Sequence, residues 1–238
     1  MKRIYLTLGM MAMLFLVPSC VMYHPQSVDV PLINHKEDLR VDAAFSLTVL
    51  GLQPALNATV SYGFTDWNAA QFHVNWNGMK SFYVQPAVGA YKPFGGHFVL
   101  EGYAGYGFGY SCYTKSDNAE QQSSGSSSNL NYTTKYDGTY QVPFLQVNAG
   151  WVDLAMGCVD VGVGLKAAPF FPNFTQRHES GDPTYYRTPC PMLEPQLLLR
   201  VGGGNFKVTL RAGICTFFDQ ADFGYDPTDV SVGFNLRF

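Results

Sequence analysis

Charged side chains are scarce in this chain. Only 14% of the 238 residues are Asp, Glu, Lys or Arg, against about a quarter in an average soluble domain. The formal net charge is −3, so no basic surface for nucleic acid is expected. After the first 20 residues, no apolar run approaches the ~18 residues that a membrane-spanning helix needs. These shortages exclude a nucleic-acid-binding protein and a helical membrane protein.

Catalytic and metal-binding motifs are also missing from the sequence. Neither G-x-S-x-G nor H-E-x-x-H occurs, and there is no phosphate loop and no D-x-D-x-D-G calcium loop. Two loops collect groups that could activate water or hold a cation. They contain His178, Glu179 and Asp182 in one loop and Asp219, Asp222, Asp226 and Asp229 in the other. Solvated acidic loops are the simpler interpretation, so we predict no catalytic residue, no metal and no cofactor.

Aromatic residues and glycine are abundant, and they occur in short alternating runs. Aromatics make up 15% of the chain, and there are 24 Gly. In "DVSVGFNLRF" at the C-terminus, every second residue from Val230 to Phe238 is apolar and the others are small or polar. A period of two indicates a strand with one apolar and one polar face. Ten segments follow this pattern: 39–50, 55–64, 69–77, 81–91, 98–110, 140–151, 155–167, 192–201, 206–215 and 229–238.

The lengths of the connectors between these segments predict the architecture. The three long connectors, 111–138, 169–190 and 216–228, all fall on one side, whereas turns such as "KPFGG" and "GGGN" fall on the other. Transmembrane β-barrels have this asymmetry and an even number of strands. We therefore predict an all-β protein, a closed antiparallel transmembrane β-barrel of ten strands over residues 39–238. Eight strands is the alternative count, and a secreted β-sandwich is the competing architecture.

The last strand carries a family resemblance. "GFNLRF" resembles the end of small Gram-negative outer-membrane β-barrels, which commonly finish in an alternating strand with a C-terminal Phe. The resemblance implies contact with outer-membrane lipids and reading of Phe238 by the barrel-assembly machinery, but it implies no activity. Closure would pair this strand with segment 39–50. An aromatic girdle is expected at the periplasmic edge, from Trp67, Tyr91, Phe94, Phe98, Trp151 and Phe206.

The N-terminus has the features of a targeting segment. A basic start is followed by an apolar run from Ile4 to Val17, which predicts a signal peptide over residues 1–19. "LVPSC" resembles a bacterial lipobox, which implies lipid attachment at Cys20 and a lipoprotein-type barrel. Ordinary cleavage near Ser19 is the alternative. Residues 20–38 contain two prolines and no periodicity, so we expect an extended tether, with the N-terminus and the C-terminus both periplasmic.

The polar faces of the predicted strands carry a cluster of charges. Ten strands enclose a narrow lumen that side chains can fill, and buried charges must be paired to be tolerated. We therefore expect a salt-bridged plug, with a narrow channel as the alternative. The predicted lumen charges are Arg40, Glu101, Asp160, Lys166, Glu194, Arg200, Lys207 and Arg211.

Two cysteines are candidates for a disulfide. If the strands joined by "GGGN" pair so that residue numbers sum to about 407, Cys215 lies opposite Met192 and diagonal to Cys190. A Cys190–Cys215 bridge would then be within reach, with Cys112 as the competing partner.

The function predicted from these features is non-enzymatic. The long outer loops are rich in aromatic residues, which could contact an envelope protein or a glycan. We predict a surface-binding barrel or an accessory subunit of an envelope complex. The alternatives are an enzyme with a rim site acting on lipid or peptide, tested by His178, and a narrow channel.

Deletion of Phe238 is expected to lower the amount of protein in the outer membrane far more than it destabilises the folded barrel. Burial of one aromatic ring contributes only ~1.5–3 kcal/mol, whereas loss of the assembly signal would stop insertion. Immunoblots of outer-membrane fractions measure the effect, with Phe206→Ala as the matched girdle control. Normal outer-membrane levels of the deletion variant would refute the role of Phe238.

Overall fold

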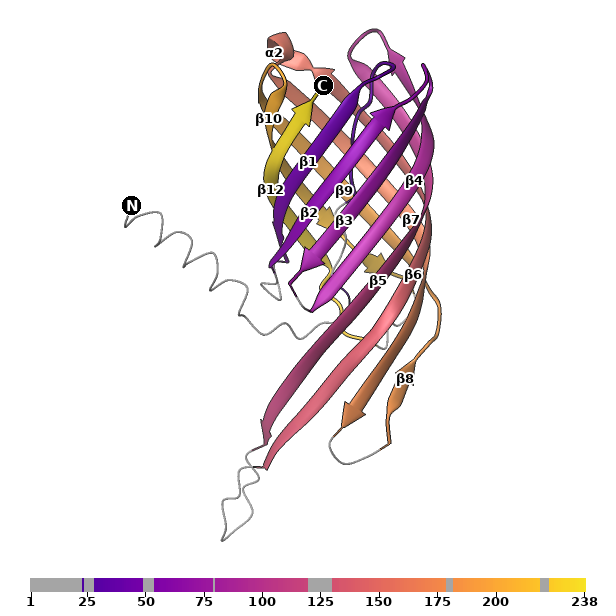
Figure 1. The fold of residues 1–238 in the computed structure, drawn as a ribbon, viewed down its shortest axis with the longest axis vertical. Coiled ribbons are helices and arrows are strands. Elements are labelled where there is room, and N and C mark those ends of the chain that lie inside the picture. The colour runs from indigo at the N-terminus through magenta and orange to yellow at the C-terminus, as the bar shows by residue number, and fades with distance from the viewer. Residues whose placement is uncertain are drawn as a thin grey trace, which may run out of the picture.

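The computed structural model describes residue 23 and residues 28–48, 54–78, 80–119, 130–178, 182–218 and 223–238. One sheet of twelve strands accounts for almost all of them (Figure 1). Ten strands form the wall: β1 (Leu39–Leu47), β2 (Pro54–Gly63), β3 (Asn68–Asn77), β4 (Ser81–Phe94), β5 (Phe98–Ala119), β6 (Leu130–Asp153), β7 (Val159–His178), β9 (Cys190–Gly203), β10 (Phe206–Ile214) and β12 (Thr228–Arg237). Two short strands, β8 (Thr184–Tyr186) and β11 (Thr216–Phe217), lie outside the ring, and α2 (Leu154–Gly157) is a single turn. Within these ranges no helix has the length and apolarity to cross a membrane.

The barrel closes through its first and last strands. β1 pairs antiparallel with β2 on one side and with β12 on the other, where Val41 lies opposite Leu236 and Phe45 opposite Val232. This pairing removes both free edges of the sheet. The predicted ten-strand closed barrel is confirmed, the eight-strand alternative is wrong, and the β-sandwich is wrong because both end strands belong to one sheet.

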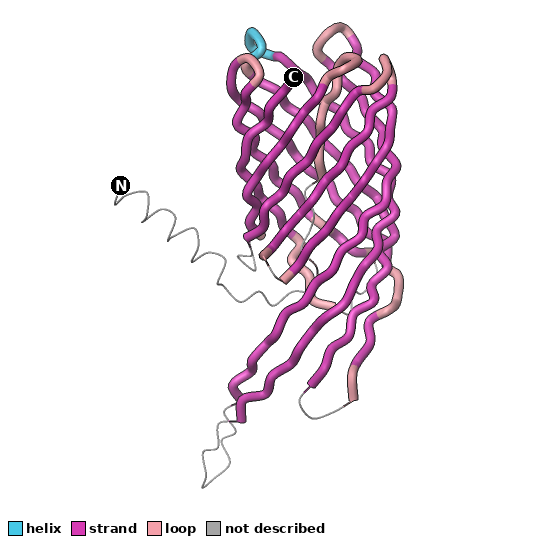
Figure 2. The backbone as a smooth tube through the Cα atoms, in the orientation of Figure 1, coloured by secondary structure: helices cyan, strands magenta, loops and turns pink. Residues whose placement is uncertain are grey.

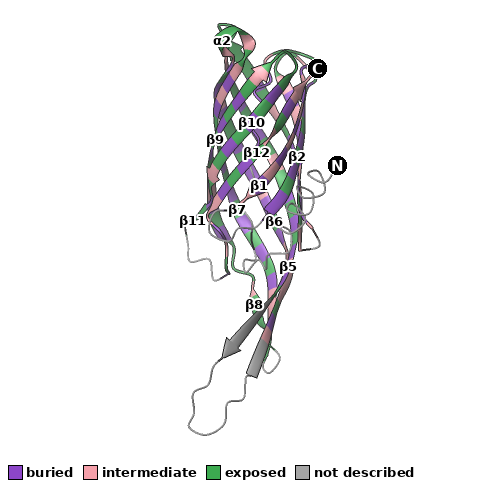
Figure 3. Ribbon diagram, turned by 90° about the vertical axis from the view of Figure 1, so that its left-hand side faces the viewer, coloured by how far each residue is buried: buried purple, intermediate pink, exposed green. Residues whose placement is uncertain are grey.

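The side chains alternate between lumen and outer wall as the sequence pattern predicts. Along β9, Gln196 and Arg200 are buried, whereas Leu197 is 62% exposed and Val201 is 48% exposed. Figure 3 shows the same alternation of buried and exposed residues around the wall. Apolar groups outside and charged groups inside are the reverse of a water-soluble core, and they suit a wall that faces lipid.

The two ends of the barrel differ in the length of their connections (Figure 2). We call the end with turns 64–67, 95–97 and 204–205, the α2 turn and Phe238 the short-turn mouth. The other end is the long-hairpin mouth, from which β5, β6 and β7 project beyond the wall. β5 has 22 residues and β6 has 24. The asymmetry of the connectors predicted from the sequence is therefore present.

Two stretches predicted as loops are largely strand. β5 continues to Ala119, β6 begins at Leu130 and β7 continues to His178, so connectors 111–138 and 169–190 are shorter than expected. Cross-strand contacts hold the extension together, since the rings of Tyr113 and Tyr136 stack with centroids 4.4 Å apart. The polar composition of the stretch gave no alternation by which to recognise it as strand.

Two smaller corrections lie at the short-turn mouth. The strand predicted over 155–167 begins only at Val159, because Ala155 and Met156 have left-handed φ angles of 51° and 63° that interrupt a strand. Of the expected girdle, Tyr91 points inward and is 3% exposed, with its hydroxyl donating to the Thr65 carbonyl at 2.7 Å. Trp67, Phe94, Trp151 and Phe206 are exposed on the outer wall.

The segment before β1 runs through the lumen. Its residues from Val28 to Ile33 are all buried. Tyr23, further back, forms a bridge with Tyr225 at the long-hairpin mouth, whereas Asp38 pairs with Arg237 at the short-turn mouth. The tether was expected on the periplasmic side together with Phe238, whereas its described ends, Tyr23 and Asp38, lie at different mouths. Tyr23 lies at the mouth opposite Phe238.

Glycines on the inner face of the wall make room for this segment. A Cβ atom on Gly164 would lie 2.8 Å from Val30, and one on Gly150 would lie 2.9 Å from Leu32. Such distances are too short for carbon atoms in contact. The missing side chains on β6 and β7 therefore form the groove in which the tether packs.

Gly164→Leu is expected to destabilise the barrel, because the new side chain collides with Val30 and Val28. Overpacking costs about 1–3 kcal/mol, which should lower the urea midpoint of unfolding in lipid vesicles, followed by heat-modifiable mobility on gels. Gly203→Leu is the control, because a Cβ there meets nothing within 4 Å. Equal midpoints for the two variants would contradict the packing of the tether against β7.

Candidate functional site

An aspartate on β1 lies at the centre of the lumen network. Asp42 accepts from Arg200 at 3.0 Å and from Arg211 at 2.8 Å, and the Asn235 amide donates to it at 2.7 Å. All four side chains are buried. Two guanidinium groups from β9 and β10 therefore share one carboxylate from β1, and a second negative group is needed to balance them.

The tether supplies that second carboxylate. Asp29 accepts from Arg211 at 2.8 Å and from the Gln71 amide at 3.1 Å. Its backbone carbonyl accepts from Gln146 at 2.6 Å. Strands β3, β6 and β10 thus all bind one residue of the tether, and Asp29 is held from several sides of the lumen.

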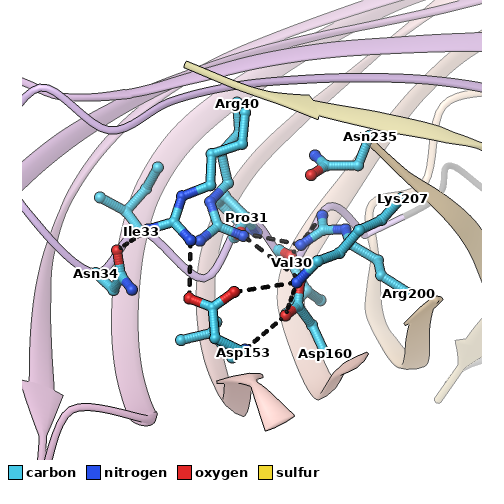
Figure 4. Close-up of polar contacts among 12 residues, drawn as sticks. Val30, Pro31, Ile33, Asn34, Arg40, Asp153, Asp160, Arg200, Lys207 and Asn235 are labelled. Atoms are coloured by element: carbon cyan, nitrogen blue, oxygen red, sulfur yellow. Dashed lines mark hydrogen bonds and ion pairs between the residues drawn. The ribbon is translucent and has the colours of Figure 1, made fainter. Parts of the chain in front are cut away.

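Side chains of the lumen bind the backbone of the tether between Val30 and Ile33. The Arg200 guanidinium donates to the carbonyl oxygens of Val30 at 3.0 Å and Pro31 at 3.1 Å (Figure 4). The Ile33 amide donates to the Glu101 carboxylate at 2.7 Å. Buried backbone groups outside secondary structure need such partners, and lumen residues provide them here.

A second group of ion pairs surrounds the short-turn mouth. Lys207 contacts Asp160 at 2.5 Å and Asp153 at 3.2 Å (Figure 4). Arg237 contacts Asp153 at 2.9 Å and Asp38 at 3.1 Å. Asp38 belongs to the tether, whereas the other four groups come from the ends of four different strands. The network therefore joins the tether to the rim of the barrel where β1 meets β12.

The other mouth is closed by aromatic side chains. The Tyr23 ring packs edge-on against Phe170 at 4.8 Å and Tyr140 at 5.3 Å between centroids. Its hydroxyl donates to Glu194 at 2.9 Å, and Glu194 is also in direct contact with Lys166. The tether is therefore anchored at both ends of the lumen, by rings at one mouth and by ion pairs at the other.

The eight predicted lumen charges all lie inside the barrel and are buried. Sequence reasoning missed four partners of these charges, namely Asp29, Asp38, Asp42 and Asp153, and also missed Arg237, which pairs with two of them. Asp42 was recognisable, because it alternates with Arg40 on the polar face of the first strand. Asp29 carried no such signal, since it lies in a segment without periodicity.

Two broad depressions formed by the described residues lie on the outer wall. Depressions of about 540 and 690 Å³ are lined by lipid-facing residues such as Trp76 and Val147. A cavity in the lumen beside Val28 and Gln196 has a volume of only about 10 Å³, room for about one water molecule. The tether and the charged side chains thus occupy the space where a solute would pass.

The predicted disulfide is not formed. Paired residues on β9 and β10 have numbers that sum to 409, as in Phe206 with Gly203, and Thr216 pairs with Leu193 in β11. This register aligns Cys215 with Glu194 and not with Met192. Four residues of strand, roughly 13 Å, then separate that position from Cys190, and a disulfide needs Cα atoms within about 7 Å.

Within the described residues, His178 contacts Thr134 and Gln176. Thr134 contacts the Nδ1 atom of His178 at 3.2 Å, and the Gln176 amide contacts its Nε2 atom at 2.9 Å. Asp226 accepts hydrogen bonds from the amide and the hydroxyl of Thr228 at the start of β12. Glu179, Asp219 and Asp222 lie outside the described residues. In the part of the chain that the structure describes, no three His, Cys, Asp or Glu side chains are grouped to hold a metal ion.

Comparison with solved structures agrees with this architecture. The outer-membrane protease OmpT from Escherichia coli superposes with a TM-score of 0.59 at 8% identity, covering 90% of this chain and 99% of that chain. The KdgM porin, in complex with disordered oligogalacturonate, has a TM-score of 0.42 at 13% identity and covers 84% of this chain and 99% of its own. No protein-family model matches the chain, and no curated protein matches it.

The likeness to OmpT defines the class of protein through its fold alone. The chain is a closed antiparallel β-barrel of the outer-membrane type. At 8% identity the likeness to the protease shows the architecture alone.

Asp42→Asn is expected to destabilise the barrel strongly, because two buried guanidinium groups lose their shared charge. Breaking a buried pair typically costs ~3–5 kcal/mol, measured by urea unfolding in vesicles. Arg177→Gln is the control, since its contact with Asp137 at 3.8 Å is exposed and worth at most about 1 kcal/mol. A midpoint for Asp42→Asn no lower than that of the control would show that Asp42 does not organise the lumen.

Proposed function

We propose that this protein is a self-plugged outer-membrane β-barrel of a Gram-negative bacterium that does not conduct. It acts at the cell surface through its long hairpins, as a non-enzymatic binding protein or an accessory subunit of an envelope complex. The observation that carries the proposal is the tether, which fills the lumen and is bound there from the surrounding strands. A barrel so filled works through its outer surfaces and not through its pore.

The outer wall supports the location. Large apolar side chains are exposed on every wall strand except β1, among them Leu145, Val163 and Val232 at 66%, 50% and 53% exposure. Water would disfavour such a surface, whereas lipid accommodates it. Outer-membrane barrels have long extracellular loops and short periplasmic turns. We therefore orient the long-hairpin mouth toward the medium and the short-turn mouth, with Phe238, toward the periplasm.

The lumen argues against the channel alternative. An open pore needs a continuous path of water, and a narrow barrel of ten strands is easily filled by side chains. Here the Asp29 carboxylate pairs with Arg211 and accepts a hydrogen bond from Gln71, and the Asp29 carbonyl accepts one from Gln146. Ions would have to break these buried contacts in order to pass.

The projecting hairpins support the surface role. β8 pairs with the end of β7. Together with the β5–β6 and β6–β7 pairs, it makes three strand pairs beyond the wall. Tyr185 is 55% exposed, and the Arg187 guanidinium lies 4.9 Å from the centre of its ring. Exposed aromatic and guanidinium groups suit a protein or glycan partner. A rim enzyme has less support, because both ring nitrogens of His178 contact Thr134 and Gln176.

Planar-bilayer recordings test the plug. The purified full-length barrel is expected to give no steady single-channel current. Deletion of residues 21–33 should produce a current that favours anions, because Arg200 and Arg211 lose the Asp29 carboxylate and the tether carbonyls.

Deletion of residues 120–129 in the hairpin is the control and should leave the membrane silent. A large steady current from the full-length protein would refute the proposal. So would a silent 21–33 deletion variant that has folded, as judged by heat-modifiable mobility.

A further inference from the structure

We propose that the chain is threaded outward through its own barrel, so that residues before Tyr23 emerge at the cell surface. Cys20 then carries its lipid in the outer leaflet and not in the inner, periplasmic one. This inference rests on the orientation in the proposed function, and it assigns a site and a leaflet to the modification.

The direction of the tether is set at the short-turn mouth. Asp38 contacts Arg40 at 3.3 Å and Arg237 at 3.1 Å. The next residue, Leu39, pairs with the end of the chain, since its amide donates to the Phe238 carbonyl at 3.2 Å. The end of the tether that leads into β1 therefore lies beside the C-terminus.

Contacts with β9 follow the tether backwards to the opposite mouth. β9 runs from Cys190 at the long-hairpin mouth to Gly203 at the short-turn mouth. Arg200 binds Pro31, whereas Glu194 binds Tyr23. Six residues of β9 separate these partners, roughly 20 Å along the strand, so the chain crosses most of the barrel between them.

Tyr23 is held firmly at the outer end. It is fully buried, and its ring contacts Tyr140, Phe170 and Phe217 with centroids 4.8–5.8 Å apart. Its amide donates to the Gly224 carbonyl at 3.4 Å. Because ring contacts, a backbone bond and the bond to Glu194 act together, the point of exit is a built site.

Chain length places the lipid on the same side. Cys20 lies outside the described residues, but it is only three positions before Tyr23, a reach of about 10 Å at most. The apolar band of a barrel is about 25 Å tall, so the periplasmic leaflet is out of reach.

Assembly follows from the same geometry. A lipidated end is too bulky to pass the point where Asp29 meets Arg211 and Gln146. The strands must therefore close around a tether that is already in place. This order makes the tether part of the folding barrel and not a later addition.

Cysteine labelling on cells tests the threading. A reporter, Met22→Cys, is placed in a background with Cys112→Ser and Cys158→Ser and treated with a membrane-impermeant maleimide. Two control proteins mark the two mouths. One keeps native Cys158, exposed beside α2 at the short-turn mouth, in a background with Cys112→Ser alone. The other carries Arg187→Cys, on the exposed chain after β8, in the same background as the reporter.

We expect Met22→Cys and Arg187→Cys to react on intact cells, and Cys158 to react only after the outer membrane is permeabilised. A Met22→Cys reporter that behaves like Cys158, or that reacts in neither state, would overturn the inference. Failure of Arg187→Cys on intact cells would instead overturn the orientation in the proposed function. The bilayer recordings and the labelling are independent measurements, so the proposed function and the threading can fail separately.

The lipid is tested by incorporation of radiolabelled palmitate. Wild-type protein should be labelled and Cys20→Ser should not, while the Met22→Cys reporter in a Cys20→Ser background should still react on intact cells. The lumen contacts of the tether do not involve the lipid, so the exit should persist without it. An unlabelled wild-type protein would overturn the lipid assignment and leave the threading to be judged by the maleimide.

Discussion

The pairing of buried arginines with aspartates is the interaction on which the rest of this structure depends. Charges enclosed by a barrel wall lose their hydration, and only close opposite charges and hydrogen bonds offset that cost. Asp42 serves both Arg200 and Arg211, and Asp29 on the tether supplies the next negative charge to Arg211. The charges of the wall are therefore not balanced without the tether, and the buried groups of the tether depend on the wall for their partners.

The two sides of the lumen meet the tether by different means. On β6 and β7, glycines remove the side chains and let Val30 and Leu32 approach the backbone. On β9 and β10, long arginines reach across to its carbonyls and to Asp29. Packing on one side and charge on the other fix the tether laterally, while Tyr23 and Asp38 fix it at the two ends. A barrel closed in this way has its working surface outside the lumen, on the hairpins and at the point where the chain emerges.

Local pattern was enough to predict the wall. The faces of the strands, their number and the pairing of segment 39–50 with 229–238 all follow from the period-two alternation and the connector lengths, because each strand must turn one face to lipid. The same pattern identified Arg200 and Lys207 as inward-facing. It could not identify Asp29, nor the strand extensions beyond residues 110 and 169, where the polar composition hides the pairing.

The barrel follows from the local pattern of the sequence, whereas the contents of its lumen depend on tertiary contacts. Arg211 and Asp29 are 182 residues apart, and no periodicity links a segment without secondary structure to the strands around it. The shift of two residues in register between β9 and β10, which separates Cys215 from Cys190, is likewise a property of the assembled turn and not of either strand. Alternation is dictated by the geometry of one strand, whereas the path of the tether depends on a lumen that exists only after all ten strands have closed.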